Sequence, residues 1–221
     1  MPIRPGTVEI IGEDTTRLLE ITMDIVSHFA ARFDRTREEE LSLEDYLAAC
    51  KRDPLSYASA AERMLRAIGE PQTVDTRNDP RLSRLFANKV IKIYPAFAEF
   101  YGLEDSIEQV VSYFRHAAQG LEEKKQILYL LGPVGGGKSS IAERLKSLMQ
   151  EVPFYAIKGS PVNESPLGLF DPDEDGAILE KEYGIPRRYL TRILSPWAVK
   201  RLEEFGGDIR RFRVVKLRPS V

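Results

Sequence analysis

The chain has 221 residues, a length that suits one large domain or a small helical domain followed by a larger one. Apolar residues make up 43% of the sequence and charged residues 30%, as in ordinary soluble globular proteins. The net charge of −2 gives no reason to expect a nucleic-acid partner, and no apolar run approaches the roughly 18 residues of a membrane-spanning helix. The single cysteine, Cys50, can form no internal disulfide, and the N-terminus lacks a secretory signal. We therefore expect a cytoplasmic protein without a membrane anchor.

The first part of the chain is predicted to be helical. Apolar residues recur at helical spacing over 18–29, after a short N-terminal arm. Ser42 is a suitable N-cap for a helix that ends near Cys50. The elements expected next are helices over 57–68 and 81–87 and a polar loop over 72–80.

The second part has the pattern of an α/β domain. An amphipathic helix is expected over 103–119. The apolar run 126–131 is bounded by turn signals and predicts a buried parallel strand, which a glycine-rich loop follows directly. A helix over 139–150 and a strand over 154–157 then complete one βαβ unit. Further elements are expected over 177–183 and 196–205 (helices) and over 213–217 (a strand). The predicted parts are an N-terminal arm and helix (1–37), an α-helical module (38–93) and an α/β domain (94–221).

The glycine-rich loop matches the phosphate-binding Walker A pattern G-x-x-x-x-G-K-[ST]. Its residues are Gly132, Pro133, Val134, Gly135, Gly136, Gly137, Lys138 and Ser139. Glycines allow successive backbone N–H groups to point at one anion, and the following helix adds the positive end of its dipole. Lys138 can reach the β- and γ-phosphates, and the Ser139 hydroxyl can ligate Mg²⁺. The motif and its context predict binding of ATP with Mg²⁺; the alternative is a glycine-rich structural turn.

Two residues upstream are candidates for contact with the base. Tyr101 and Gly102 precede the amphipathic helix, at the position that wraps the adenine in AAA+ ATPases. The alternative is that Tyr101 is an ordinary core residue. A hydrolase of this class also needs an acidic residue at the end of a neighbouring strand. No apolar run that ends in Asp-Glu follows the loop, so the sequence identifies no catalytic residue.

Several dispersed segments resemble the PrkA serine protein kinase family. They are AAERML (60–65), PRLSRLF (80–86), GLEEKKQILYLLGPVGGGKS (120–139), EKEYGIPRRY (180–189) and SPWA (195–198). The resemblance runs from about residue 38 to residue 221. It implies a bacterial protein with an AAA+ ATPase domain, a P-loop three-layer α/β sandwich, that phosphorylates proteins on serine or threonine. Family members are much longer, so the resemblance indicates an N-terminal fragment in which the sandwich is incomplete.

Other functions stay open at this level. An AAA+ module can also belong to an ATP-dependent protease or a protein-remodelling factor, and a fragment could bind nucleotide without any enzymatic activity. The resemblance implies a protein substrate for the intact protein. AAA+ modules usually form rings, which leaves a homo-oligomer open.

Two charged stretches have no place in the nucleotide site. Residues 171–182 fit the calcium-loop pattern D-x-[DN]-x-[DN]-G-x₅-E, but a proline-rich stretch precedes them where a helix is needed. We expect no calcium there and expect Asp173 or Asp175 to cap the next helix. The segment 185–221 carries ten Lys or Arg residues against three acidic ones. Such a basic end could hold phosphate or a partner, or could form only solvated helix faces.

Overall fold

The computed structural model describes residue 27 and residues 39–219. Contacts divide the chain into two units, Met1–Glu39 and Glu40–Val221. Of the predicted N-terminal arm and helix, only Ser27 lies within the described residues, and it is helical. The arrangement described below is that of the second unit.

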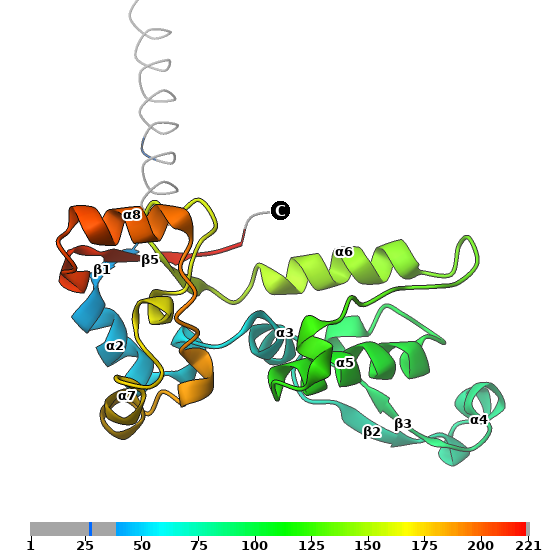
Figure 1. The fold of residues 1–221 in the computed structure, drawn as a ribbon. Helices are drawn as coiled ribbons and strands as arrows, with labels where there is room; N and C mark the ends of the chain where they lie inside the picture. The colour runs from blue at the N-terminus through cyan, green and yellow to red at the C-terminus, as the bar shows by residue number, and fades with distance from the viewer. Residues whose placement is uncertain (1–26, 28–38, 220–221) are drawn as a thin grey trace, which may run out of the picture. The chain divides into compact units, whose positions relative to one another are not determined.

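The second unit is a mixed α/β structure with two small sheets (Figure 1). Its helices are α2 (Leu43–Arg52), α3 (Ala60–Ile68), α4 (Pro80–Phe86), α5 (Glu104–Ala118), α6 (Lys138–Met149), α7 (Gly176–Tyr183) and α8 (Pro196–Glu204). Its strands are β1 (Glu39–Ser42), β2 (Gln72–Asp75), β3 (Val90–Ile93), β4 (Phe154–Ile157) and β5 (Arg213–Leu217). One sheet has the order β1-β5-β4, and the other pairs β2 with β3.

Helix ends follow their capping residues. The Ser42 hydroxyl accepts a hydrogen bond from the Asp45 N–H at 3.0 Å, which begins α2 where the sequence predicts. Helix α3 begins three residues later than predicted, because Ser59 and Glu62 form a capping box at its start. Gly69 ends α3 with a φ of 76°, a conformation in the left-handed region that glycine adopts without steric cost.

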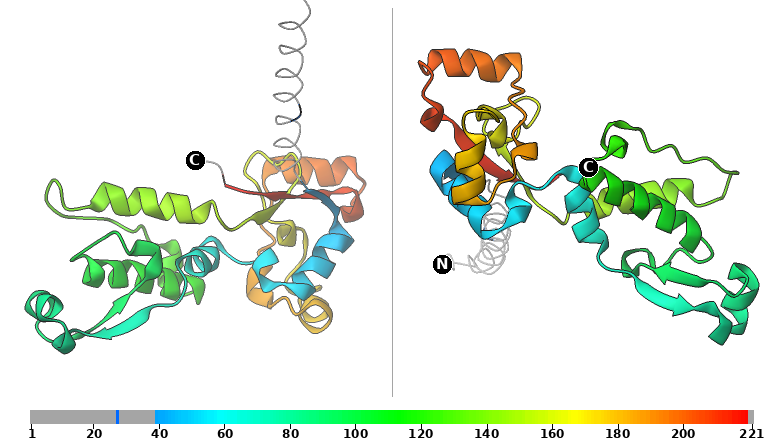
Figure 2. Two further views of the ribbon diagram at one scale, coloured as in Figure 1. Left: turned by 180° about the vertical axis from the view of Figure 1, so that it is seen from behind. Right: turned by 60° about the horizontal axis from the view of Figure 1, so that its bottom comes forward.

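The first hydrophobic cluster covers the β1-β5-β4 sheet. Helices α2 and α7 contact each other, and α2 also contacts β5. Tyr46, Ile185 and Val214 are almost completely buried in this cluster. Strands β4 and β5 are antiparallel, with Phe154 opposite Leu217 and Ile157 opposite Val214. Figure 2 shows α7 and α8 with these strands from two further directions.

The second hydrophobic cluster fixes the position of α6. Helix α3 contacts both α5 and α6, and α5 also contacts β3. Met64, Val111 and Leu148 bring one buried side chain from each of these three helices into the cluster. The apolar spacing predicted on α5 and α6 is confirmed, since Ile107, Val110, Val111, Ile141, Leu145 and Leu148 are all buried. Packing of α6 through this face sets where its N-terminus points.

The prediction of a polar loop over 72–80 is wrong. Gln72–Asp75 forms β2, which pairs antiparallel with β3, and Gln72 lies opposite Ile93. The sequence of β2, QTVD, lacks the alternation of apolar and polar residues by which a half-buried strand is recognised, and its first two residues are exposed. The first 93 residues are therefore not purely helical.

The prediction of a buried strand over 126–131 is also wrong for this structure. The segment is extended but forms no ladder with any described strand, and Ile127, Tyr129 and Leu131 are 90%, 76% and 84% exposed. Leu128 and Leu130 pack against the second cluster. A strand needs a hydrogen-bonded neighbour, and none of the described strands lies beside this segment. The βαβ unit expected around α6 is consequently absent from the described residues.

Packing crosses the boundary that the sequence predicts near residue 94. Helix α3 contacts α5 and α6, and α2 contacts α7, so elements from both sides share each cluster. The three-part division stays a prediction. None of the helices in the described part of the chain is long and apolar enough to span a lipid bilayer.

Candidate nucleotide-binding site

The glycine-rich loop lies directly before the first residue of α6, Lys138. Gly135 and Gly137 have φ values of 80° and 75°, where a residue with a side chain costs roughly 1–2 kcal/mol. The Gly136 N–H donates to the carbonyl oxygen of Pro133 at 3.2 Å and closes a turn. A Cβ on Gly136 would lie 3.1 Å from that same oxygen. The backbone of the loop therefore favours glycine at these three positions.

Lys138 folds back over the loop. Its Nζ donates to the carbonyl oxygens of Gly132 at 2.8 Å and Pro133 at 2.6 Å. Within the described residues, no carboxylate pairs with this ammonium group. The first N–H groups of a helix also have no intrahelical acceptor. An ammonium group and unpaired N–H groups at one helix N-terminus suit an anion such as a phosphate.

A wide cavity of about 1000 Å³ lies beside the loop. The glycine loop contributes Gly135, Gly136 and Gly137 to its wall, and α6 contributes Ser139, Ser140, Glu143, Arg144 and Ser147. Of the residues on this helix face, only Ser139 belongs to the motif found in the sequence. Glu143 and Ser147 follow Ser139 at steps of four residues, and residues with this spacing lie on one side of a helix, so the spacing could have identified them as further wall residues.

Tyr101 lies on another wall of the same cavity, together with Leu103. It is 87% exposed, so the alternative of an ordinary core residue is wrong. Gly102 does not line the cavity, but its φ of 76° turns the chain between Tyr101 and α5. Arg144 Nε donates to the carbonyl oxygen of Ala96 at 2.7 Å, which ties α6 to the segment that carries Tyr101. The cavity thus brings an exposed aromatic ring to the same space as the glycine loop.

Residues 41–221 match the PrkA AAA domain family. The chain belongs to this family. It is 65% identical over 203 residues to "Serine/threonine kinase YeaG" of Escherichia coli K12, an alignment that covers 90% of this chain and 32% of that protein. It is 34% identical over 209 residues to "ATP-dependent protease PrkA" of Bacillus subtilis 168, covering 88% of this chain and 30% of that protein. No solved structure matches the chain.

Membership of the PrkA AAA domain family confirms the resemblance found in the sequence. An AAA domain is a nucleotide-binding domain, which agrees with the glycine loop at the start of α6. The chain spans about a third of the length of the curated relatives it matches. The activity of the whole protein is therefore a separate question from the binding chemistry of this chain.

The acidic side chains of the loop at 171–182 make contacts within the protein. Asp171 accepts hydrogen bonds from the N–H groups of Asp173 and Glu174, which together with nearby Arg192 lower the pKa of its carboxyl. Arg187 pairs with Asp173. No group of carboxylates or imidazoles in the described part of the chain is arranged to hold a metal ion. Asp175 directly precedes α7, as expected of its capping residue, but its side chain makes no capping hydrogen bond to the helix. Its Oδ2 accepts a hydrogen bond from the Asp171 N–H instead.

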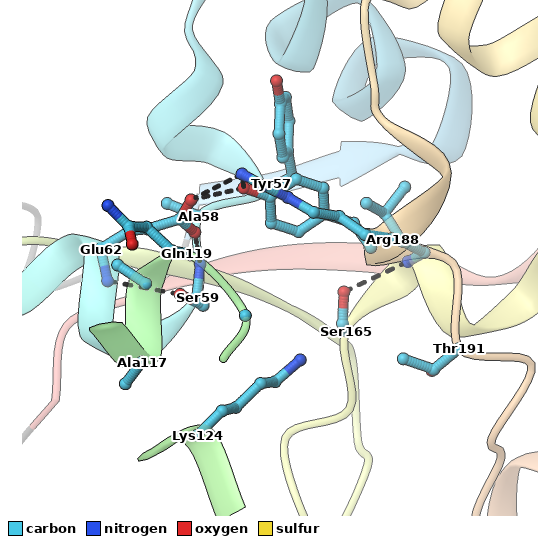
Figure 3. A pocket seen from close by; sticks show the side chains of 14 residues that line it. Tyr57, Ala58, Ser59, Glu62, Ala117, Gln119, Lys124, Ser165, Arg188 and Thr191 are labelled. Atoms are coloured by element: carbon cyan, nitrogen blue, oxygen red, sulfur yellow. Dashed lines mark hydrogen bonds and ion pairs between the residues drawn. The ribbon is translucent and has the colours of Figure 1, made fainter. Parts of the chain in front are cut away.

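A second cavity of about 450 Å³ lies between α3, α5 and the residues around Arg188 (Figure 3). Glu62 is held on both oxygens, by the Ser59 N–H at 2.7 Å and by the Tyr189 hydroxyl. The Arg188 guanidinium lies over the Tyr189 ring, and its Nη2 atom is 3.5 Å from Oε1 of Glu62. The Glu62 carboxylate thus connects the start of α3 to the segment around Tyr189 through hydrogen bonds within the chain.

Proposed function

We propose that the chain binds ATP through the loop from Gly132 to Ser139, with the adenine against Tyr101. The observation that carries the proposal is the common cavity, which is lined both by the glycine loop and by an exposed tyrosine. The PrkA AAA domain family supports the nucleotide class, and the cavity geometry suggests the orientation. The phosphates face the N-terminus of α6, and the base faces the segment before α5.

The phosphate end uses charge and backbone donors. Lys138 holds only neutral carbonyl oxygens in the structure, so a phosphate oxygen offers its ammonium group a stronger acceptor. Exchange of these acceptors moves the side chain away from Gly132 and Pro133 and toward the anion. The Ser139 hydroxyl lies on the cavity wall, one residue into α6, where it can ligate Mg²⁺ beside the phosphates.

The proposed AAA+ sandwich requires the segment 126–131 to become a strand. Its side chains already alternate between exposed and packed positions, the two-residue period of a strand. We infer that neighbouring strands in the whole protein flank this segment and form the central part of the sheet. The loop after it then lies at the carboxyl end of a parallel strand, the position at which α/β sheets bind ligands.

For the whole protein we propose an ATP-dependent serine/threonine protein kinase. The support is the 65% identity to the E. coli relative that carries this name. The second candidate is an ATP-dependent protease, the name of the B. subtilis relative at 34% identity. Transfer of labelled phosphate to a protein supports the kinase, whereas ATP-dependent peptide release supports the protease. A chain that binds ATP and releases no phosphate is a binding domain alone. A cytoplasmic location, a protein substrate and a ring-shaped oligomer stay predictions.

The experiment on this chain is ATP binding by the Lys138→Ala variant. Charge-assisted hydrogen bonds contribute about 1.5–3 kcal/mol each, so we expect the affinity for a fluorescent ATP analogue to fall at least about tenfold. The matched control is Lys125→Ala, since the Lys125 side chain is 77% exposed and its one ion pair within the described residues is with Glu122. Equal affinity of the Lys138→Ala variant and the unaltered chain would show that the loop does not hold the phosphates.

A further inference from the structure

The C-terminal part of the chain forms another concave site, which shares no residue with the nucleotide cavity. This basic-aromatic pocket has a volume of about 290 Å³. Its cationic residues are Lys158, Arg201, Arg211 and Arg213, and two half-buried rings, Trp197 and Phe205, also line it. They come from α8 and its C-cap residue, from the turn after β4, and from the short turn before β5 together with the first residue of that strand. The pocket thus gathers part of the basic stretch that the sequence analysis left without a role.

The pocket carries more positive than negative charge. Glu40 pairs with Lys158 and lies 3.8 Å from Arg213, and the hydrogen bond with Lys158 is the main cause that lowers the pKa of its carboxyl. Arg201 pairs with Glu204 at 2.7 Å. With Arg210 and Asp208 beside Arg211 included, five cationic side chains and three carboxylates leave a surplus of two positive charges. A dianion is the complementary ligand.

Arg211 is oriented by ring stacking, and the nearby carboxylate of Asp208 interacts with it electrostatically without forming an ion pair with it. Its Cζ lies 4.6 Å from the centroid of the Phe205 ring, and that ring packs edge-on against Phe212 at 5.1 Å. Among the residues that the structure describes, no carboxylate pairs with Arg211. The neighbouring Arg210 differs, because its Nε pairs with Asp208 at 2.8 Å. Stacking on a ring leaves the N–H groups in the guanidinium plane available to a ligand.

The opposite side of the pocket is formed by Trp197. Gly159 has a φ of 79°, and an added Cβ there would lie at van der Waals distance, 3.5 Å, from the indole ring, so the ring lies beside this turn. Arg201 lies over the same ring, with its Cζ 5.8 Å from the centroid. Ser195 caps α8 through its hydroxyl and also bonds to Glu164, which fixes the helix turn that carries the indole. The rings therefore form walls around the cationic groups.

We propose that the basic-aromatic pocket binds a phosphoryl group carried by a serine or threonine side chain of a protein segment. A phosphorylated hydroxyl side chain carries about −1.5 to −2 charges at pH 7, which matches the surplus of two positive charges. Arginine forks bind phosphate oxygens in a bidentate manner. The volume lies at the lower end of small-molecule pockets, which suits one phosphorylated side chain better than a whole nucleotide. Trp197 and Phe205 provide apolar surface for the flanking peptide.

Trp197 is the only tryptophan of the chain, so its fluorescence reports directly on the pocket. The probe is a seven-residue glycine-alanine peptide with a central phosphoserine, titrated into the 221-residue chain. We expect a saturable change in emission that the unphosphorylated peptide does not produce. In the Arg211→Gln variant the affinity is expected to fall about tenfold or more, since a charged hydrogen-bonding group is lost. The Lys138→Ala variant is expected to bind the phosphopeptide as the unaltered chain does.

The matched control is Arg210→Gln, which removes the same charge one residue away and outside the pocket. Its affinity is expected to stay within about twofold of the unaltered chain, because exposed ion pairs contribute little. Arg211→Lys keeps the charge without the planar fork and provides a second variant with an intermediate affinity. Three results would overturn the proposal: no saturable change, equal losses in the Arg210→Gln and Arg211→Gln variants, or binding of inorganic phosphate as tight as that of the phosphopeptide. The last would identify a site for free anions.

Discussion

Gly137 of the glycine loop lies against Leu103, the residue that directly precedes α5, and its substitution by alanine tests this contact. Its φ is 75°, and an added Cβ would lie 2.9 Å from Cδ1 of Leu103, closer than carbon atoms approach without displacement. The backbone conformation costs roughly 1–2 kcal/mol at both glycines. Gly135 is the matched position, because its φ is 80° and a Cβ there meets no atom within 4 Å. The atom that must move near Gly137 is the end of a partly buried, flexible leucine side chain, so we expect the Gly137→Ala variant to lose up to about 1 kcal/mol more stability than Gly135→Ala.

Urea unfolding followed by circular dichroism measures both variants in two backgrounds, with Leu103 present and with Leu103→Ala. The difference between the glycine variants is expected to shrink toward zero in the Leu103→Ala background, since the clashing methyl group is gone. The same Gly137→Ala variant is expected to bind ATP more weakly, because the first turn of α6 must shift. If the difference persisted unchanged without the Leu103 side chain, the contact would not be its cause, and the argument would fail.

Three other outcomes are expected. Leu148→Ala, which leaves a cavity where α6 enters the second cluster, should reduce the free energy of unfolding by about 2–5 kcal/mol in the urea assay. The hydrogen bond from Lys158 lowers the pKa of Glu40 in the folded state, so the unaltered chain should be more stable than the Glu40→Gln variant. This difference in stability is complete above the ordinary pKa of 4.5 and declines as the pH falls through the lower pKa of the folded state. Urea midpoints of both proteins at neutral and acidic pH measure the difference, and a difference that did not change with pH would contradict this reasoning. Burial raises the pKa of the Cys50 thiol to about 11, so a thiol reagent at neutral pH should label Cys50 at the rate of unfolding, and rapid labelling of the folded chain would contradict this.

The helices could be predicted from sequence because their signals are local. Ser42 and Gly184 lie within one residue of the helix ends that they define, and the apolar residues of α6 lie at fixed steps along the chain. Strands β4 and β5 were predicted for a similar reason, since both are short apolar runs between turns. Their pairing is antiparallel and was not predicted, because it depends on residues about 60 positions apart.

The two strand errors have opposite causes. The segment Gln72–Asp75 lacks apolar alternation but has a partner in β3, and the ladder makes it a strand. The segment 126–131 has strong strand character and no partner among the described strands. In the candidate site, the loop was found from a short motif, whereas Leu103 and the α6 face were missed because they meet only through folding. The candidate phosphate loop and Tyr101 could therefore be found from sequence, whereas the remaining wall residues could not.

The exposed face of the segment 126–131 has a consequence for the behaviour of this chain in solution. Ile127, Tyr129 and Leu131 form a row of apolar side chains next to backbone groups that make no ladder in the described structure. Such an edge can pair with the same edge of another copy, which is the first step of aggregation. The turn that precedes it, Glu122-Glu123-Lys124-Lys125, carries no net charge, and Lys125 pairs with Glu122, so this turn does not repel a second copy. The chain should therefore self-associate as its concentration rises, with little dependence on salt.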